Sequence, residues 1–239
     1  YKSGLSKEAY GYLAGFTSEV PDFSGQDSEY PAVPWYDELE TEYTEEFDGD
    51  IFSNLKSLFE DNEDASEFKA WYWQKITDRM GETALISEWC KENEKGYFPQ
   101  IKTNANPYSQ VLQTGSALQY LRRFNLPSVS FSGKTAVSHF LPVSVSSLAK
   151  QFGSGTAGAS VLGGLGWGIR PGEFEEYMTR LIECGINMFV FHTSFLHLNY
   201  KSLSRNQISF PTHITWKKVV PQILERLREK AEDETKRPH

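Results

Sequence analysis

The sequence contains no apolar stretch long enough to cross a bilayer, and no basic segment leading into an apolar one as in secretory leaders. It has no basic stripe either. Acidic residues outnumber basic ones, and much of the net charge of −8 arises between residues 37 and 67. Nucleic-acid-binding proteins neutralise phosphates with clustered lysines and arginines. The sequence therefore predicts no membrane role and no nucleic-acid partner.

Cysteine is scarce, because Cys90 and Cys184 are the two in the chain and their wide separation fits no metal-ligand spacing. Both lie in segments that we expect to be helical, which predicts two buried free thiols. The sequence also lacks an N-x-S/T glycosylation acceptor. No metal site, cofactor or cellular compartment follows from these residues.

Glycine is concentrated in residues 153–168, but the signatures of nucleotide binding are absent there. The stretch has no Lys-Ser/Thr ending and no acidic ribose contact after it. Residues 158–164, GASVLGG, match the G-x-S-x-G nucleophile elbow only loosely. Nucleotide binding and esterase chemistry are disfavoured, and small residues that allow close packing in a crowded strand are the preferred interpretation.

Residues 10–23, YGYLAGFTSEVPDF, form an apolar run that ends abruptly in Thr17, Ser18 and Glu19. Such a run predicts a strand buried on both faces, as in a parallel sheet covered by helices. Glu19 then stands at the carboxyl end of the strand, where α/β barrels build their catalytic sites. It is the candidate acid, and an ion pair with a nearby lysine is the structural alternative.

Strand-like and helical patterns alternate along the rest of the chain, as in a parallel α/β sheet. Short strands are expected at 97–101, 126–131, 157–162 and 186–192. Helical segments are expected over 35–59 with a break at Gly49, over 68–90 as one longer helix, and at 108–124, 143–152 and 173–184. We therefore predict an α/β fold, a partial or incomplete TIM-type (β/α) barrel of about five parallel strands.

A closed barrel needs eight strands, so three are missing from this count. Either the first three units lie on an absent N-terminal segment or another chain, or a smaller open sheet stands alone. Residues 1–224 are expected to form the barrel portion, and residues 225–239 a charged helix end and tail.

Several segments, in their order, resemble the catalytic barrel of glycoside hydrolase family 106, the α-L-rhamnosidase type. They are GFTSE, PWYDEL, SEWCKE, VSVSSLAKQFG, GGLGWG, CGINMFVFH and ITWKKVVPQILERL. The resemblance spans about residues 11–227 and implies that GYLAGFTSE is the fourth barrel strand and INMFVFH the eighth. It implies a glycosidase, a hydrolase that acts on an α-L-rhamnoside-type bond by acid/base catalysis, with Glu19 as the acid.

The chain departs from the family pattern at two places. Family members have Thr-Asp-Glu-Pro at the fourth strand end, where this chain has Thr17, Ser18, Glu19 and Val20. Members also carry a Ser-Glu pair shortly before Gly-Trp-Gly, where this chain has Ala159 and Ser160. Glycoside hydrolysis usually needs two carboxyl groups, and a serine hydroxyl cannot replace one. The partner could be Asp22, Asp27 or Glu29, or a residue of the missing strands.

Other polar and aromatic residues suit a sugar site. His192 ends an apolar strand, where a neutral imidazole could hydrogen-bond a hydroxyl or bind a metal. Asn104 follows the strand at 97–101, and Ser160 lies in the strand at 157–162. Trp167 and Trp35 could each stack on a sugar ring or belong to the core. The competing hypotheses are a carbohydrate-binding or structural relative without catalysis, and a fragment completed by another chain.

Overall fold

A computed structural model of the chain describes residues 15–19, 33–60, 65–80, 84–102, 116–132, 139–192 and 208–236. Over these residues the protein is α/β, with a parallel sheet and helices. The chain divides into two compact units. The sheet unit comprises residues 1–19, 85–104 and 121–239. The helical unit comprises residues 20–84 and 105–120.

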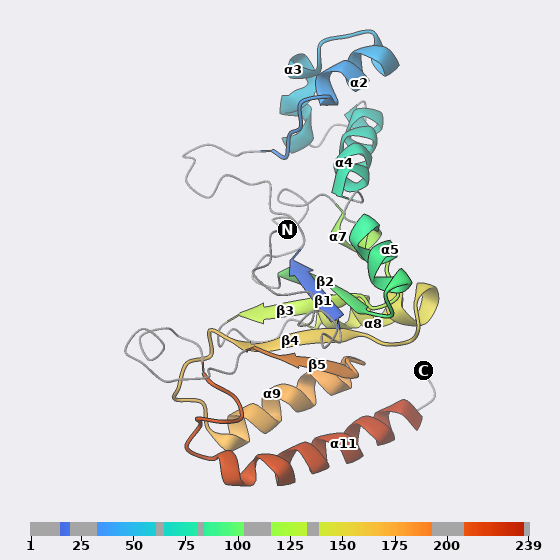
Figure 1. Cartoon of the computed structure of the whole chain (residues 1–239). Coiled ribbons are helices and arrows are strands. Elements are labelled where there is room, and N and C mark those ends of the chain that lie inside the picture. Colours follow the sequence, from blue (N-terminus) through green and yellow to red (C-terminus); the bar gives the residue numbers. More distant parts are fainter. Residues whose placement is uncertain are drawn as a thin grey trace, which may run out of the picture. The chain divides into compact units, whose positions relative to one another are not determined.

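Five strands form one sheet whose spatial order is the order of the sequence. Every neighbouring pair is parallel, and Figure 1 shows the strands side by side. The strands are β1 (Gly15–Glu19), β2 (Gly96–Lys102), β3 (Ser128–Ser132), β4 (Gly158–Gly163) and β5 (Met188–Phe191). The expected parallel strands are confirmed, each within a few residues of the predicted bounds.

The helices of the two units largely follow the predicted pattern, and residues 108–115 of the helix expected at 108–124 lie outside the described residues. The helices are α2 (Leu39–Phe47), α3 (Ile51–Asn54), α4 (Ser66–Met80), α5 (Ala84–Glu92), α7 (Ala117–Leu121), α8 (Phe140–Phe152), α9 (Pro171–Glu183) and α11 (Val220–Lys236), with 3-10 turns η1 (Leu55–Phe59) and η4 (Lys217–Val219). The single helix expected over 68–90 is wrong, because the segment forms α4 and α5. Helix α11 continues to Lys236, so it includes the first part of the segment expected as a charged helix end and tail.

One face of the sheet is apolar and packs on helices. Ile101, Val129 and Ala159 stand in one register row, and all three are buried. Two residues further along β4 and β5, Val161 pairs with Phe191, whose ring centroid lies 6.4 Å from that of Phe174 in α9. Because side chains alternate along a strand, these residues define the helix-facing side of the sheet.

The opposite face of the sheet carries polar residues among apolar ones such as Leu162 and Val190. One register row runs from Gln100 through Ser128 to Gly158 and Met188. In the next register row on this face, Ser130 pairs with Ser160. The Ser128 hydroxyl donates to the carbonyl of Pro99 at 2.7 Å, so this buried side chain is satisfied locally. In β3 the serines alternate with Val129 and Phe131.

Helix α9 is specified by its ends. Pro171 occupies the first turn, and the Glu173 carboxylate accepts the Arg170 backbone N–H at 2.8 Å. Gly185, with φ of 86°, follows the last turn, and glycine adopts this left-handed backbone without steric cost. Between these ends the helix buries Phe174, Met178, Leu181 and Ile182.

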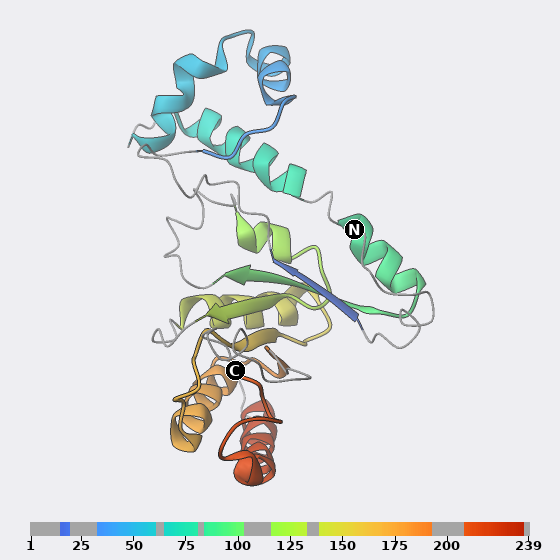
Figure 2. The same ribbon diagram turned by 60° about the vertical axis from the view of Figure 1, so that its left-hand side comes forward.

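Helix α11 lies beside α9, as the two views show (Figures 1 and 2). It buries Val220, Ile223 and Leu227. Two ion pairs join the helices at their exposed margin: Arg226 contacts Glu175 through two 2.6 Å hydrogen bonds, and Lys230 contacts Glu183 at 2.7 Å. The apolar side of α11 therefore closes over α9, and the charges align the two helices.

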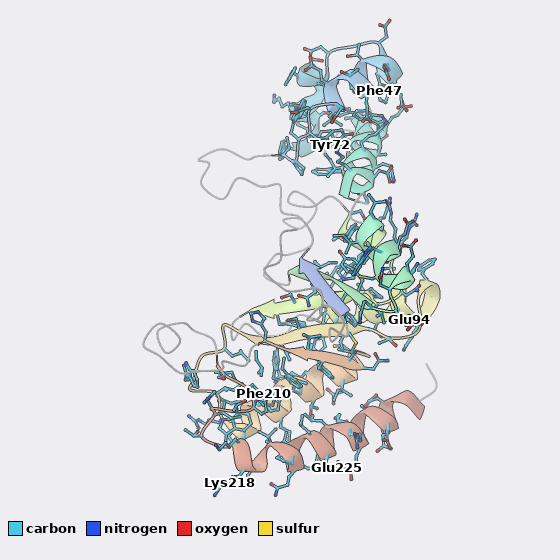
Figure 3. All side chains as sticks on the ribbon, viewed as in Figure 1. Phe47, Tyr72, Glu94, Phe210, Lys218 and Glu225 are labelled. Atoms are coloured by element: carbon cyan, nitrogen blue, oxygen red, sulfur yellow. The ribbon has the colours of Figure 1, made fainter. Side chains whose placement is uncertain are left out.

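The helical unit has an aromatic core of its own. Tyr43 packs edge-on against Phe68 and Trp71, at 5.6 Å and 5.3 Å between ring centroids. Tyr72 is fully buried and donates its hydroxyl to the Pro34 carbonyl. Phe47 packs against this core, and Figure 3 labels it together with Tyr72. The predicted break near Gly49 is confirmed, because α2 ends at Phe47 and the next residue, Asp48, has a left-handed φ of 50°.

Candidate functional site

The candidate acid, Glu19, is the last residue of β1 and stands in register with Gln100. It therefore lies at a carboxyl end of the parallel sheet, as the sequence predicted. In parallel sheets the carboxyl ends of all strands lie on one edge, and the chain leaves each strand there into a loop. The backbone position of Glu19 suits a residue that acts at this edge.

His192 follows β5 at the same edge. Its backbone N–H donates to the carbonyl of Val161 at 2.9 Å, which prolongs the pairing of β5 with β4 by one residue. The side chain is exposed, and its Nδ1 lies 3.8 Å from where a Cβ on Gly163 would stand. The absence of a side chain at Gly163 thus leaves room beside the imidazole, on the strand that also carries Ser160.

Ser160 stands in the middle of β4, on the polar face, between Ser130 of β3 and Val190 of β5. It is 7% exposed. A carboxylate at this position would be held by the backbone but largely removed from water. Desolvation of this kind raises a carboxyl pKa, so the site would favour a protonated acid over a nucleophile.

Trp167 lies in the connection from β4 to α9 and is half-buried. Its indole Nε1 is buried and has no hydrogen-bond partner among the described residues. A Cβ added to either neighbouring glycine, Gly166 or Gly168, would meet nothing within 4 Å. The backbone on either side of Trp167 is therefore open at both glycine positions.

Of the other predicted site residues, the structure describes Trp35. Trp35 belongs to the helical unit, packs against its aromatic core and stacks on Phe52 with ring centroids 5.4 Å apart. One face of Trp35 is thus already covered, which supports the core interpretation of this residue. Asp22 and Asn104 lie outside the described residues, as do the alternative acids Asp27 and Glu29.

The described residues include no cluster of three histidines, cysteines or carboxylates that could hold a metal ion, and no helix among them is long and apolar enough to span a membrane. The two cysteines are free and buried, as predicted, and burial raises the pKa of each thiol. Thiolate chemistry at neutral pH is thereby disfavoured for both.

The polar face is the feature that sequence reasoning missed. Its clearest signal was present in β3, where SVSFS alternates serine with apolar residues. Gln100 stands in the same register row as Ser128, and no local pattern connects these two residues. Their proximity is a consequence of strand pairing, which a single sequence does not display.

Comparisons with protein-family models, with curated proteins and with solved structures each find no match. The resemblance to the rhamnosidase-type barrel therefore rests on the quoted segments alone.

Proposed function

We propose that the carboxyl edge of this sheet binds a carbohydrate, and that Glu19 acts there as the general acid of a glycosidase of the α-L-rhamnosidase type. The five strands are then consecutive strands of an eight-stranded (β/α) barrel. The observation that carries the proposal is the contrast between the two faces of the sheet, one apolar and helix-covered and the other bearing Gln100, Ser128, Ser130 and Ser160.

The strand order supports a barrel over a doubly wound sheet. Parallel crossovers are almost always right-handed, so strands added consecutively in one direction place their helices on the same face. The contacts agree: Phe124, in the β2–β3 connection, meets Tyr97 at 5.5 Å, and α9 meets Phe191. In a doubly wound fold the order reverses and helices cover both faces. A polar second face fits the interior of a barrel that binds a polar ligand.

The register also relates the candidate residues to one another. Pairing from Glu19 leads through Gln100 and Ser128 to Met188. In an eight-stranded barrel of shear eight, positions at one height advance by about one residue per strand, hence by about two at β3 and about four at β5. Two residues beyond Ser128 in β3 is Ser130, and four residues beyond Met188 in β5 is His192. A closed barrel would therefore hold Glu19, Ser130 and His192 in one layer, contributed by alternate strands.

The first experiment compares wild type with Glu19→Gln on aryl α-L-rhamnosides. With a poor leaving group we expect turnover to fall by about 100-fold to 10,000-fold, because proton donation contributes roughly that factor. Sugar affinity measured by calorimetry should be retained. Equal turnover in the two proteins would remove Glu19 from the mechanism. Binding by both proteins with turnover by neither would favour the second hypothesis, a carbohydrate-binding relative.

Ser160 separates these two hypotheses further. If loss of a carboxylate at this position silenced the enzyme, Ser160→Glu should restore some hydrolysis of activated glycosides, although burial at β4 will raise the pKa of the new carboxyl. Robust wild-type hydrolysis that is only harmed by Ser160→Glu would contradict silencing. It would show that the partner acid lies elsewhere, with Asp22 and Asp27 as the next positions to change.

A further inference from the structure

A pocket of about 200 Å³ lies on the helix side of the sheet, between α9 and the connection that follows β4. Leu165 and Ile169 supply apolar walls, and both are buried. Glu173 and Tyr177 supply the polar groups from α9. These two residues are one helical turn apart, so they share a face of the helix.

The phenol of Tyr177 is held in place by its ring packing. Its ring packs edge-on against Phe131 of β3, with centroids 6.1 Å apart. Its hydroxyl oxygen is buried and has no partner among the described residues. Burial raises the pKa of this phenol, so the group is a neutral O–H donor under ordinary conditions. A buried hydroxyl without a partner is destabilising, which makes an acceptor supplied by a ligand favourable.

Glu173 provides the complementary group. One carboxylate oxygen, Oε2, accepts the Arg170 backbone N–H at 2.8 Å, and this contact fixes the side chain at the start of α9. The carboxylate disfavours anions near it, and the lining residues that the structure describes include no basic side chain. A ligand that fits must therefore donate to an oxygen and accept from the Tyr177 hydroxyl, which a neutral hydroxyl group does at once.

We propose that this pocket binds a small neutral polyol or monosaccharide, held by Glu173 and Tyr177 between Leu165 and Ile169. The volume equals that of roughly six or seven water molecules, which is the scale of one sugar ring. This site is separate from the strand-end residues, because Phe131 places Tyr177 on the helix side of the sheet. It therefore does not depend on the proposed glycosidase activity.

The test is calorimetric titration of the full chain with L-rhamnose, D-glucose and glycerol, with acetate as the anionic probe. At least one polyol should bind more tightly than acetate. Tyr177→Phe keeps the ring and its packing on Phe131 but removes the donor, so polyol affinity should fall about threefold to tenfold. Tyr36→Phe removes a phenol hydroxyl in the helical unit and serves as the matched control, with unchanged affinity.

Three results would overturn the proposal, two of them concerning binding and the third concerning stability. The first is the absence of polyol binding at millimolar concentration, and the second is binding that Tyr177→Phe leaves unchanged. The third is a clear loss of stability in unliganded Tyr177→Phe, because removing a hydroxyl without a partner should leave the melting temperature unchanged or raise it. Failure here is distinct from failure of the glycosidase proposal, since Glu19→Gln should not affect this binding and Tyr177→Phe should not affect hydrolysis.

Discussion

Phe174 offers the most direct test of the helix-covered face. Its side chain is fully buried, and its ring contacts those of Phe210, Trp216 and Phe191 at centroid distances of 5.2, 5.5 and 6.4 Å. Phe210, labelled in Figure 3, also lies 4.7 Å from Phe191. One ring of α9 therefore joins β5 to the segment that leads into α11.

Truncating this ring removes apolar contacts and leaves a cavity. Phe174→Ala should lower the free energy of unfolding by about 3–5 kcal/mol, the usual cost for a buried phenylalanine. In a chain of this size, each kcal/mol shifts the melting temperature by about 2–4 °C, so a decrease of about 6–20 °C is expected. Urea unfolding followed by tryptophan fluorescence and circular dichroism measures the change. Phe174→Leu keeps part of the side-chain volume, so its free energy of unfolding should lie between those of Phe174→Ala and wild type.

Phe152 at the end of α8 is the matched control, since its side chain is 57% exposed. Phe152→Ala should change the free energy of unfolding by no more than about 0.5 kcal/mol. Equal losses in the two alanine variants would refute the reasoning, because α9 could not then cover the apolar face of the sheet. The barrel proposal would then lose its main support, which is the apolar, helix-covered face of the sheet.

Two further predictions concern a turn and an ion pair. Gly185→Ala should lower the free energy of unfolding by about 1–3 kcal/mol in chemical denaturation, because φ is 86° and an added Cβ would clash with the Ser146 hydroxyl. At Gly172 an added Cβ would meet nothing within 4 Å, so Gly172→Ala should be neutral or stabilising. A larger loss of stability in Gly172→Ala than in Gly185→Ala would disprove the turn geometry. Arg226 lowers the pKa of Glu175 by hydrogen bonding, so Arg226→Gln should cost a little stability above the ordinary Glu pKa. That difference should vanish as pH falls through the lowered pKa, and a difference that persists in acid would assign the effect to packing instead.

The parts of the fold that sequence predicted well have strong local signals. Pro171 and Gly185 bound α9 because their backbone preferences act without tertiary context. The break between α4 and α5 was missed, because one glycine at position 81 is a weak signal within a continuous helical spacing. The placement of Glu19 at a strand end needed only the local run of apolar residues.

The site itself could be predicted only in part. His192 was identified because it ends an apolar run, and Ser160 because the family that the chain resembles carries a glutamate there. Both lie in or directly after a strand, as expected. The row that joins Gln100 to Ser128 arises from strand register, and the pocket at Tyr177 arises from the packing of α9 on β3. Both depend on contacts between segments far apart in the chain, which local patterns do not encode.

The position of the helical unit within the chain has a consequence for how the sheet assembles. The chain leaves β1 at Glu19 and returns only at Gly96, whereas β4 ends at Gly163 and β5 begins at Met188. A loop three times longer costs about 1 kcal/mol more to close, and pairings between distant segments form slowly. We therefore expect β2 to β5 to pair first and β1 to join last, so that the strand carrying Glu19 completes the sheet at the end of folding.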